Sequence, residues 1–105
     1  MNDIEFQKAL SEIEKDCQDF VRYENTPQQK IPKEIRDSMG NIYDKILDVL
    51  NNRDITILGT DDYYIVQHLS LMLKHSVDLL FGHFNEYDSA KEITRQCKYL
   101  KGFKN

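Results

Sequence analysis

The feature that most constrains this chain is an apolar pattern that repeats at alternating steps of four and three residues. The first segment places apolar side chains at Phe6, Leu10, Ile13, Cys17 and Phe20. A second segment does so at Ile35, Met39, Ile42, Ile46 and Val49, and the last at Ala90, Ile93, Cys97 and Leu100. These steps average the 3.6-residue turn of an α-helix, so each segment predicts a helix with one buried face.

Local signals set the predicted ends of four helices, at residues 3–24, 32–51, 60–82 and 89–101. Asn2 or Asp3 can cap the first helix, and Pro32 suits a first helical position because its missing N–H costs nothing there. Thr60 can cap the third helix, and Ser89 with Glu92 has the spacing of a capping box. With only 4 Gly and 2 Pro, the chain has too few turn residues for an all-β fold.

These helices predict an all-α fold, a four-helix bundle with up-down-up-down topology, as a single domain over residues 1–105. The connector between the second and third helices, RDITILGT, is longer and apolar, and we expect it to fold over one end of the core. Gly40 lies inside the second helix at the edge of its stripe, which suggests that another helix approaches closely there.

The net charge of −4 is unevenly distributed along the chain. Residues 1–26 hold seven acidic and three basic side chains, whereas residues 88–105 hold two and five. In the predicted topology an acidic first helix would lie against a basic last helix; the alternative is a functional basic patch at Arg95, Lys98, Lys101 and Lys104. The acidic total argues against general nucleic-acid binding, which needs a basic face.

The sequence lacks the patterns that are typical of a membrane-spanning helix or a secretory signal peptide. Apolar runs are only a few residues long, whereas a spanning helix needs about 20. If the chain starts at its natural start, its acidic, amphipathic first residues predict a cytoplasmic protein rather than a secreted one. Cys17 and Cys97 both fall on apolar stripes, so we expect two buried thiols rather than a disulfide.

All three histidines, His68, His75 and His83, lie on or just after the predicted third helix. His68 and His75 are two turns apart, about 10 Å along the axis, which is too far for one ion without ligands from other helices. We therefore expect half-packed boundary histidines, with no metal and no cofactor. Phosphate loops, nucleophile elbows, CxxC and the phosphotransfer histidine motif are all missing, so the chain is not expected to be an enzyme.

The third helix has more apolar residues than one buried stripe needs. Its main apolar arc, expected to face the core, consists of Ile65, Val66, Leu69, Met72, Leu73, Val77, Leu79 and Leu80. Tyr63, Tyr64, Leu71 and Phe81 fall opposite the main apolar arc, where the connector could cover them or a protein partner could bind them. Asp61, Asp62 and Asp78 lie near these residues and would steer a basic partner. The expected partner-binding set is therefore Asp61, Asp62, Tyr63, Tyr64, Leu71 and Asp78.

The favoured hypothesis is a small, non-catalytic protein-binding module that acts by occupying a partner, in the manner of immunity proteins, antitoxins or phage anti-defence inhibitors. Its partner would be a protein with a basic surface, such as a toxin, nuclease or defence effector. One alternative is a metal- or ligand-binding helical bundle centred on His68, His75 and His83. Another is a homodimer that uses the exposed side of the third helix as its own interface.

Overall fold

A computed structural model describes residues 1–53, 62–82 and 85–102 of the chain. The described residues fold into α1 (Asp3–Val21), η1 (Gln28–Lys30), α2 (Lys33–Gly40), α3 (Ile42–Asn52), α5 (Asp62–Phe81) and α6 (Glu86–Gly102). No strand occurs within them, which confirms the all-α prediction. The molecule is elongated, with extents of 45 × 23 × 20 Å.

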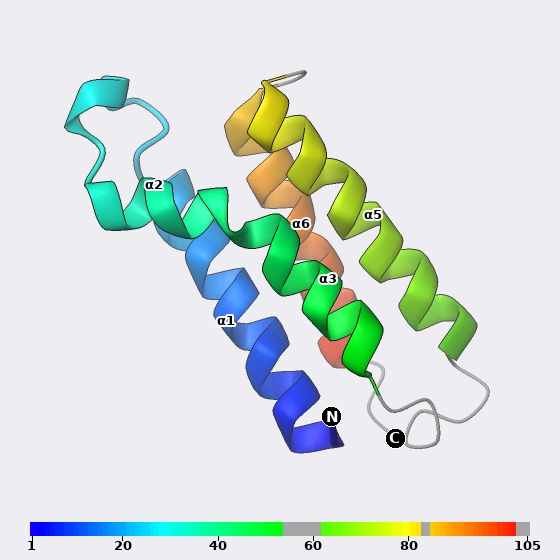
Figure 1. Cartoon of the computed structure of the whole chain (residues 1–105). Coiled ribbons are helices and arrows are strands. Elements are labelled where there is room, and N and C mark those ends of the chain that lie inside the picture. Colours follow the sequence, from blue (N-terminus) through cyan, green and yellow to red (C-terminus); the bar gives the residue numbers. More distant parts are fainter. Residues whose placement is uncertain (54–61, 83–84, 103–105) are drawn as a thin grey trace.

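The long helices pack lengthwise, as Figure 1 shows. Helix α6 packs against both α1 and α5, and α3 packs against α5 and α1. Helices α1 and α6 run antiparallel, because Glu24 pairs with Lys91 near the end of α1 and Glu14 pairs with Lys101 nearer its start. Helix α2 packs on α1 and points away from the long axis of the other helices.

One apolar core lies between the helices and uses the predicted stripes. All five stripe residues of α1 are buried, as are Ala90, Ile93, Cys97 and Leu100 of α6. In α5 the core face consists of Ile65, Leu69, Met72, Ser76 and Leu79. Burial at these positions supplies most of the stability of such a fold, at about 25 cal/mol per Å² of apolar surface removed from water. Cys17 and Cys97 are buried free thiols, as predicted.

The predicted second helix, 32–51, is wrong as a single element. It is divided into α2 and α3 at Asn41, whose backbone (φ −100°, ψ 0°) departs from helical geometry. Gly and Asn are among the poorer helix formers, so the break falls where propensity is weakest. Among the described residues, a Cβ added to Gly40 would meet nothing within 4 Å, so none of the described helices approaches closely there, contrary to the prediction.

Two other helix ends were also predicted wrongly. Helix α1 ends at Val21 rather than at residue 24, and the chain continues as a turn. Helix α6 starts at Glu86, not at Ser89, because the Asn85 side chain accepts hydrogen bonds from the backbone N–H groups of Tyr87 (2.9 Å) and Asp88 (3.1 Å). An Asn cap four residues before Ser89 thus satisfies the first turn, and Ser89 is buried inside the helix.

The predicted arc of α5 is too wide on one side. Leu80, which we expected to face the core, is 44% exposed, and Val66 and Val77 are only partly buried. Helix α5 packs against α3 and α6, and these two helices do not cover the edge of the arc where these residues lie. The predicted connector, including Ile55, Ile57 and Leu58, and the Thr60 cap lie outside the described residues.

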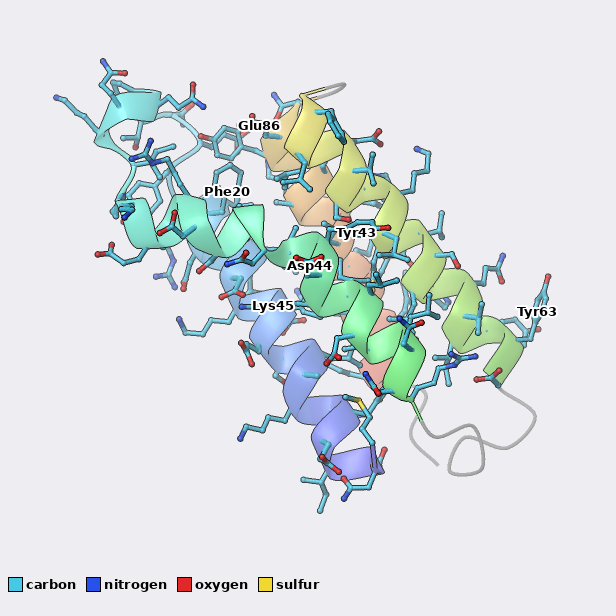
Figure 2. The ribbon with its side chains drawn as sticks, viewed as in Figure 1. Phe20, Tyr43, Asp44, Lys45, Tyr63 and Glu86 are labelled. Atoms are coloured by element: carbon cyan, nitrogen blue, oxygen red, sulfur yellow. The ribbon has the colours of Figure 1, made fainter. Side chains whose placement is uncertain are left out.

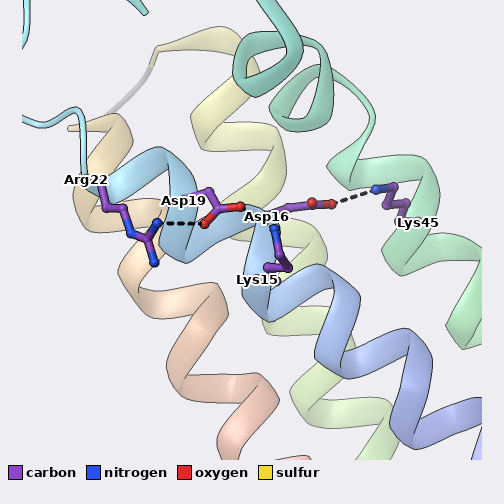
Figure 3. A network of polar contacts seen from close by, with 5 residues as sticks. All are labelled: Lys15, Asp16, Asp19, Arg22 and Lys45. Atoms are coloured by element: carbon purple, nitrogen blue, oxygen red, sulfur yellow. Dashed lines mark hydrogen bonds and ion pairs between the residues drawn. The ribbon is translucent and has the colours of Figure 1, made fainter. Parts of the chain in front are cut away.

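Charge complementarity joins α1 to both of its long neighbours. The Lys45 ammonium of α3 lies 2.6 Å from Asp16 of α1 (Figure 3). It also lies 3.2 Å from Glu12 of α1. Partial burial opposes the charged form of Lys45, but the hydrogen bonds to Asp16 and Glu12 outweigh it and raise the pKa of Lys45. On the other side, Lys91 pairs with Glu24 at 2.9 Å and Lys101 with Glu14 at 3.3 Å. The prediction that an acidic first helix faces a basic last helix is confirmed for these pairs.

Candidate functional site

Helix α5 carries a second stripe beside its core-facing one. It consists of Tyr64, His68, Leu71, His75 and Asp78, again at steps of four and three. Helix α6 meets this stripe with Asp88, Glu92, Gln96 and Tyr99. We refer to these nine residues as the α5–α6 face. It is the candidate site because it gathers histidines, carboxylates and partly exposed aromatic rings outside the core.

His68 joins the two helices near the middle of this face. Its Nδ1 is in hydrogen-bond contact with the Oε1 atom of Gln96, a side chain that is otherwise buried. Its ring stacks on Tyr99 with centroids 5.5 Å apart and an interplanar angle of 27°. His68 is half-buried, as predicted for a boundary histidine, and its ring supports Tyr99, which remains 54% exposed.

His75 lies at an open pocket of about 390 Å³ between α5 and α6. The pocket is lined by Lys74, His75, Asp78, Asn85, Asp88, Ser89 and Glu92. This volume falls in the range of about 300–1,000 Å³ that small-molecule and side-chain pockets occupy. All of these lining residues are polar or charged, in contrast to the apolar residues that form the core.

Asp78 lies at the opposite end of α5 from Tyr63 and Tyr64. We expected it to lie near an exposed patch of Tyr63, Tyr64, Leu71 and Phe81; the residue is 7% exposed and lines the pocket, with Lys74 3.4 Å from its carboxylate. Its charge therefore belongs to the pocket between α5 and α6 rather than to the surface around the tyrosines.

Glu92 lines the pocket from α6, across from Asp78 of α5. A hydrogen bond from the Arg95 guanidinium lowers the pKa of the Glu92 carboxyl, while its partial burial acts against this. The hydrogen bond from Gln96 and the nearby His75 lower the pKa further. Glu92 is therefore held as a charged carboxylate. It lines the pocket and also accepts a hydrogen bond from the Gln96 side chain.

The exposed tyrosines lie at the start of α5. Tyr63 is 73% exposed and Tyr64 52% exposed, with their rings in edge contact at 5.9 Å. Figure 2 shows the Tyr63 side chain extending away from the helices. Asp62, beside them, is held by Arg53, whose Nε lies 2.8 Å from Oδ1 and whose second nitrogen lies 3.2 Å from Oδ2. Its charge is thus paired rather than available for steering.

Of the other predicted contact residues, Leu71 lies on the same stripe as Tyr64, whereas Phe81 lies far from the tyrosines. Leu71 is 37% exposed and belongs to the α5–α6 face, between His68 and His75. Phe81 is 71% exposed but lies 18 residues after Tyr63, about 27 Å along the helix. Asp61 and His83 lie outside the described residues.

Across the part of the chain that the structure describes, no group of three His, Cys, Asp or Glu side chains is arranged to hold a metal ion. His68 and His75 contact different parts of α6, as their two-turn spacing requires. The cysteines offer no alternative site, because burial raises the pKa of the Cys97 thiol to about 12 and raises that of Cys17 as well.

The sequence analysis missed the α6 half of the face. Asp88, Glu92, Gln96 and Tyr99 recur at steps of four, four and three, which is the same helical period in polar letters. The predictions for this segment depended on its apolar spacing, on a capping box at Ser89 and Glu92, and on its basic residues. A search for polar residues at helical spacing, next to a helix with a second stripe, would have identified them.

Comparisons with protein-family models, curated proteins and solved structures yield no match to this chain. Within the described helices, none combines the length and apolar content needed to cross a bilayer.

Proposed function

We propose that this protein is a small, non-catalytic cytoplasmic binding module that acts by occupying a protein partner, as immunity proteins, antitoxins and phage anti-defence inhibitors do. Its contact surface is the α5–α6 face together with Tyr63. The proposal is supported chiefly by one observation: aromatic side chains stand exposed there, although an apolar core is already complete beneath them. Large rings with few rotors are favoured at the centres of protein interfaces.

The rings on this face are held in place before any partner binds. His68 stacks on Tyr99, and Tyr63 contacts Tyr64. A ring that is already fixed loses less conformational entropy when it is buried at an interface. Preorganised rings therefore favour binding over a purely structural role for the residues that carry them.

The charge on this face favours a basic partner. Three carboxylates, Asp78, Asp88 and Glu92, lie together at one end of it. The protein as a whole carries −4. Complementary charge raises the association rate and selects among partners more than it raises affinity.

We also propose that α1, α3, α5 and α6 form an up-down-up-down bundle from which α2 projects as a side arm. The antiparallel pairing of α1 with α6 supports this arrangement. In it, α5 has α3 and α6 as neighbours, and its remaining side is left for a partner.

Site-specific photo-crosslinking in the native cell tests the proposed function. A photoreactive phenylalanine analogue at Tyr64 should capture one predominant protein, identified by mass spectrometry. The matched control is the same analogue at Ile4, which is 79% exposed on α1, away from the proposed surface. The double variant Tyr63→Ala, Tyr64→Ala should keep its thermal unfolding midpoint and lose the captured protein. Equal capture from both positions, or wild-type affinity in the double variant, would show that the surface is misassigned.

A further inference from the structure

The pocket between α5 and α6 has more hydrogen-bond acceptors than donors in its lining. Carboxylates enter it from both walls, Asp78 from α5 and Asp88 and Glu92 from α6. Two of them have basic neighbours, since Lys74 lies 3.4 Å from Asp78 and the Arg95 Nε donates to Glu92 at 3.2 Å. Asp88 makes no ion pair with any residue that the structure describes, so the lining keeps a net negative charge.

Ser89 gives a second and independent indication of a ligand. It is 3% exposed, yet it lines the pocket. Its backbone N–H donates to the Asn85 carbonyl, but among the described residues its hydroxyl has no hydrogen-bond partner. The hydroxyl oxygen is not fully enclosed, since Glu14 Oε2 is the fully buried side-chain atom without a partner in the described structure, so the hydroxyl opens toward the pocket. A donor that enters the pocket between the carboxylates would pair with it.

We propose that this pocket receives one arginine side chain of the partner protein. A guanidinium is planar and carries five N–H donors, so it can contact carboxylates on two walls and a hydroxyl at the same time. An ammonium on a flexible stem concentrates its charge at one point and matches a two-walled site less well. The inference rests on the proposed function, and it specifies the chemistry of the partner.

The pocket is continuous with the rest of the α5–α6 face. His75 and Asp78 line it, and the same stripe leads through Leu71 and His68 to Tyr64. From Tyr64 to Asp78 the stripe is about 21 Å long. A partner segment along it would bury apolar side chains against Leu71 and the tyrosines, and place its arginine between Asp88 and Glu92.

NMR titration of the ¹⁵N-labelled full chain tests the pocket directly. The probe is N-acetyl-arginine methylamide, and the matched control is N-acetyl-norleucine methylamide, which has a similar stem without charge. We expect saturable amide shifts confined to the pocket, around Asp78, Asp88, Ser89 and Glu92, with the arginine probe alone. Shifts that are equal for both probes, or that spread over the surface without saturation, would overturn the proposal.

Variants separate the pocket from general acidity. Asp88→Asn with Glu92→Gln should weaken binding of the arginine probe at least about fivefold, because both charge-assisted contacts are lost. Ser89→Ala should weaken it about twofold to fivefold by removing one acceptor. The control is Asp44→Asn, which removes one charge from an exposed position on α3 and should leave the affinity for the arginine probe unchanged. Unchanged affinity in the double variant with a preserved NMR spectrum would exclude this pocket.

The partner assignment fails separately from the proposed function. If Tyr64 captures a protein and Asp88→Asn, Glu92→Gln binds it as tightly as the wild type does, the arginine contact is wrong although the proposed function stands. If the arginine probe binds the pocket but no protein is captured through Tyr64, the pocket serves a free guanidinium compound, and the assignment to a partner side chain is overturned.

Discussion

Helix α6 has two neighbours, and it meets them in different ways. Toward α1 it presents apolar residues and a stacked ring pair, Phe20 with Tyr87 at 4.7 Å, and ion pairs link the two helices on the surface. Toward α5 it also contributes polar residues, a pocket and an exposed tyrosine. We propose that the difference separates two roles, in which the α1–α6 contact stabilises the fold and the α5–α6 face binds a partner.

The strongest test of this contrast replaces one ring on each side of α6. Phe20→Ala should cost about 3–5 kcal/mol of unfolding free energy, because a buried ring leaves a cavity. Tyr99→Ala should cost about 1 kcal/mol or less, since its ring is half in solvent and loses mainly the stacking on His68. Urea unfolding of both variants measures the two values. Similar costs would mean that the two sides of α6 are equally structural.

A second test concerns the ion pair of Glu14 with Lys101 in the α1–α6 contact. The side chain of Glu14 is only 14% exposed, and its Oε2 atom is buried with no hydrogen-bond partner within the described structure. Lys101→Met should therefore cost about 1.5–3 kcal/mol, because it removes the partner of the other oxygen as well.

Adding Glu14→Gln to Lys101→Met should recover part of that cost, and a double-mutant cycle gives the coupling energy. If Lys101→Met leaves the urea midpoint unchanged, the pair is an ordinary surface contact.

The polar contact across the α5–α6 face should behave differently. Replacing both His68 and Gln96 by Leu should change stability by about 1 kcal/mol or less, because two desolvated polar groups are exchanged for apolar ones. Gln96→Leu alone should cost more, since it leaves the His68 nitrogen without that partner. Thermal unfolding of the three proteins tests this order. A double variant much less stable than either single one would show that this contact holds the fold together.

The smallest expected effect is a pH dependence from Glu92. Its pKa is lowered in the folded protein, mainly by the Arg95 hydrogen bond, from an ordinary value of 4.5. A lowered folded pKa adds stability above the unfolded value, and that contribution is lost as pH falls through the folded one. Because the group is partly exposed, we expect less than about 1 kcal/mol.

Urea midpoints of the wild type and Glu92→Gln at neutral pH and in steps below pH 4.5 measure this contribution. The gap between the two proteins should narrow as the pH falls. A gap that stays constant would mean that Glu92 contributes through its shape and not its charge.

Much of the fold was predictable from residue spacing. Every apolar residue that was assigned to the stripes of α1 and α6 is buried, because a helix with one apolar face can bury only that face in a core. The break at Asn41 was not predicted, since the stripe runs through it unbroken from Met39 to Ile42. Apolar spacing reports which face is buried, and it says little about whether the helix axis stays straight.

The candidate site was only half predictable. Tyr63 and Tyr64 were predicted to lie opposite the buried arc, where either the connector or a partner could cover them, and both are exposed. Asp62 and Asp78 were predicted to steer a partner; in the structure Arg53 pairs with the first, and the second lines the pocket beside Lys74. A charged residue in a sequence can attract a partner of opposite charge. Whether it does so depends on which side chains lie beside it in the folded protein.

The sequence by itself determined that this protein is built of amphipathic helices around one core, because a periodic apolar stripe can be buried in only one direction. Only the tertiary structure decided that Asp88, Glu92 and Ser89 of α6 share a pocket with His75 and Asp78 of α5. The physical reason is that polar contacts between helices depend on how two helices are aligned along each other. That alignment is set by packing over the whole core, and neither helix encodes it alone.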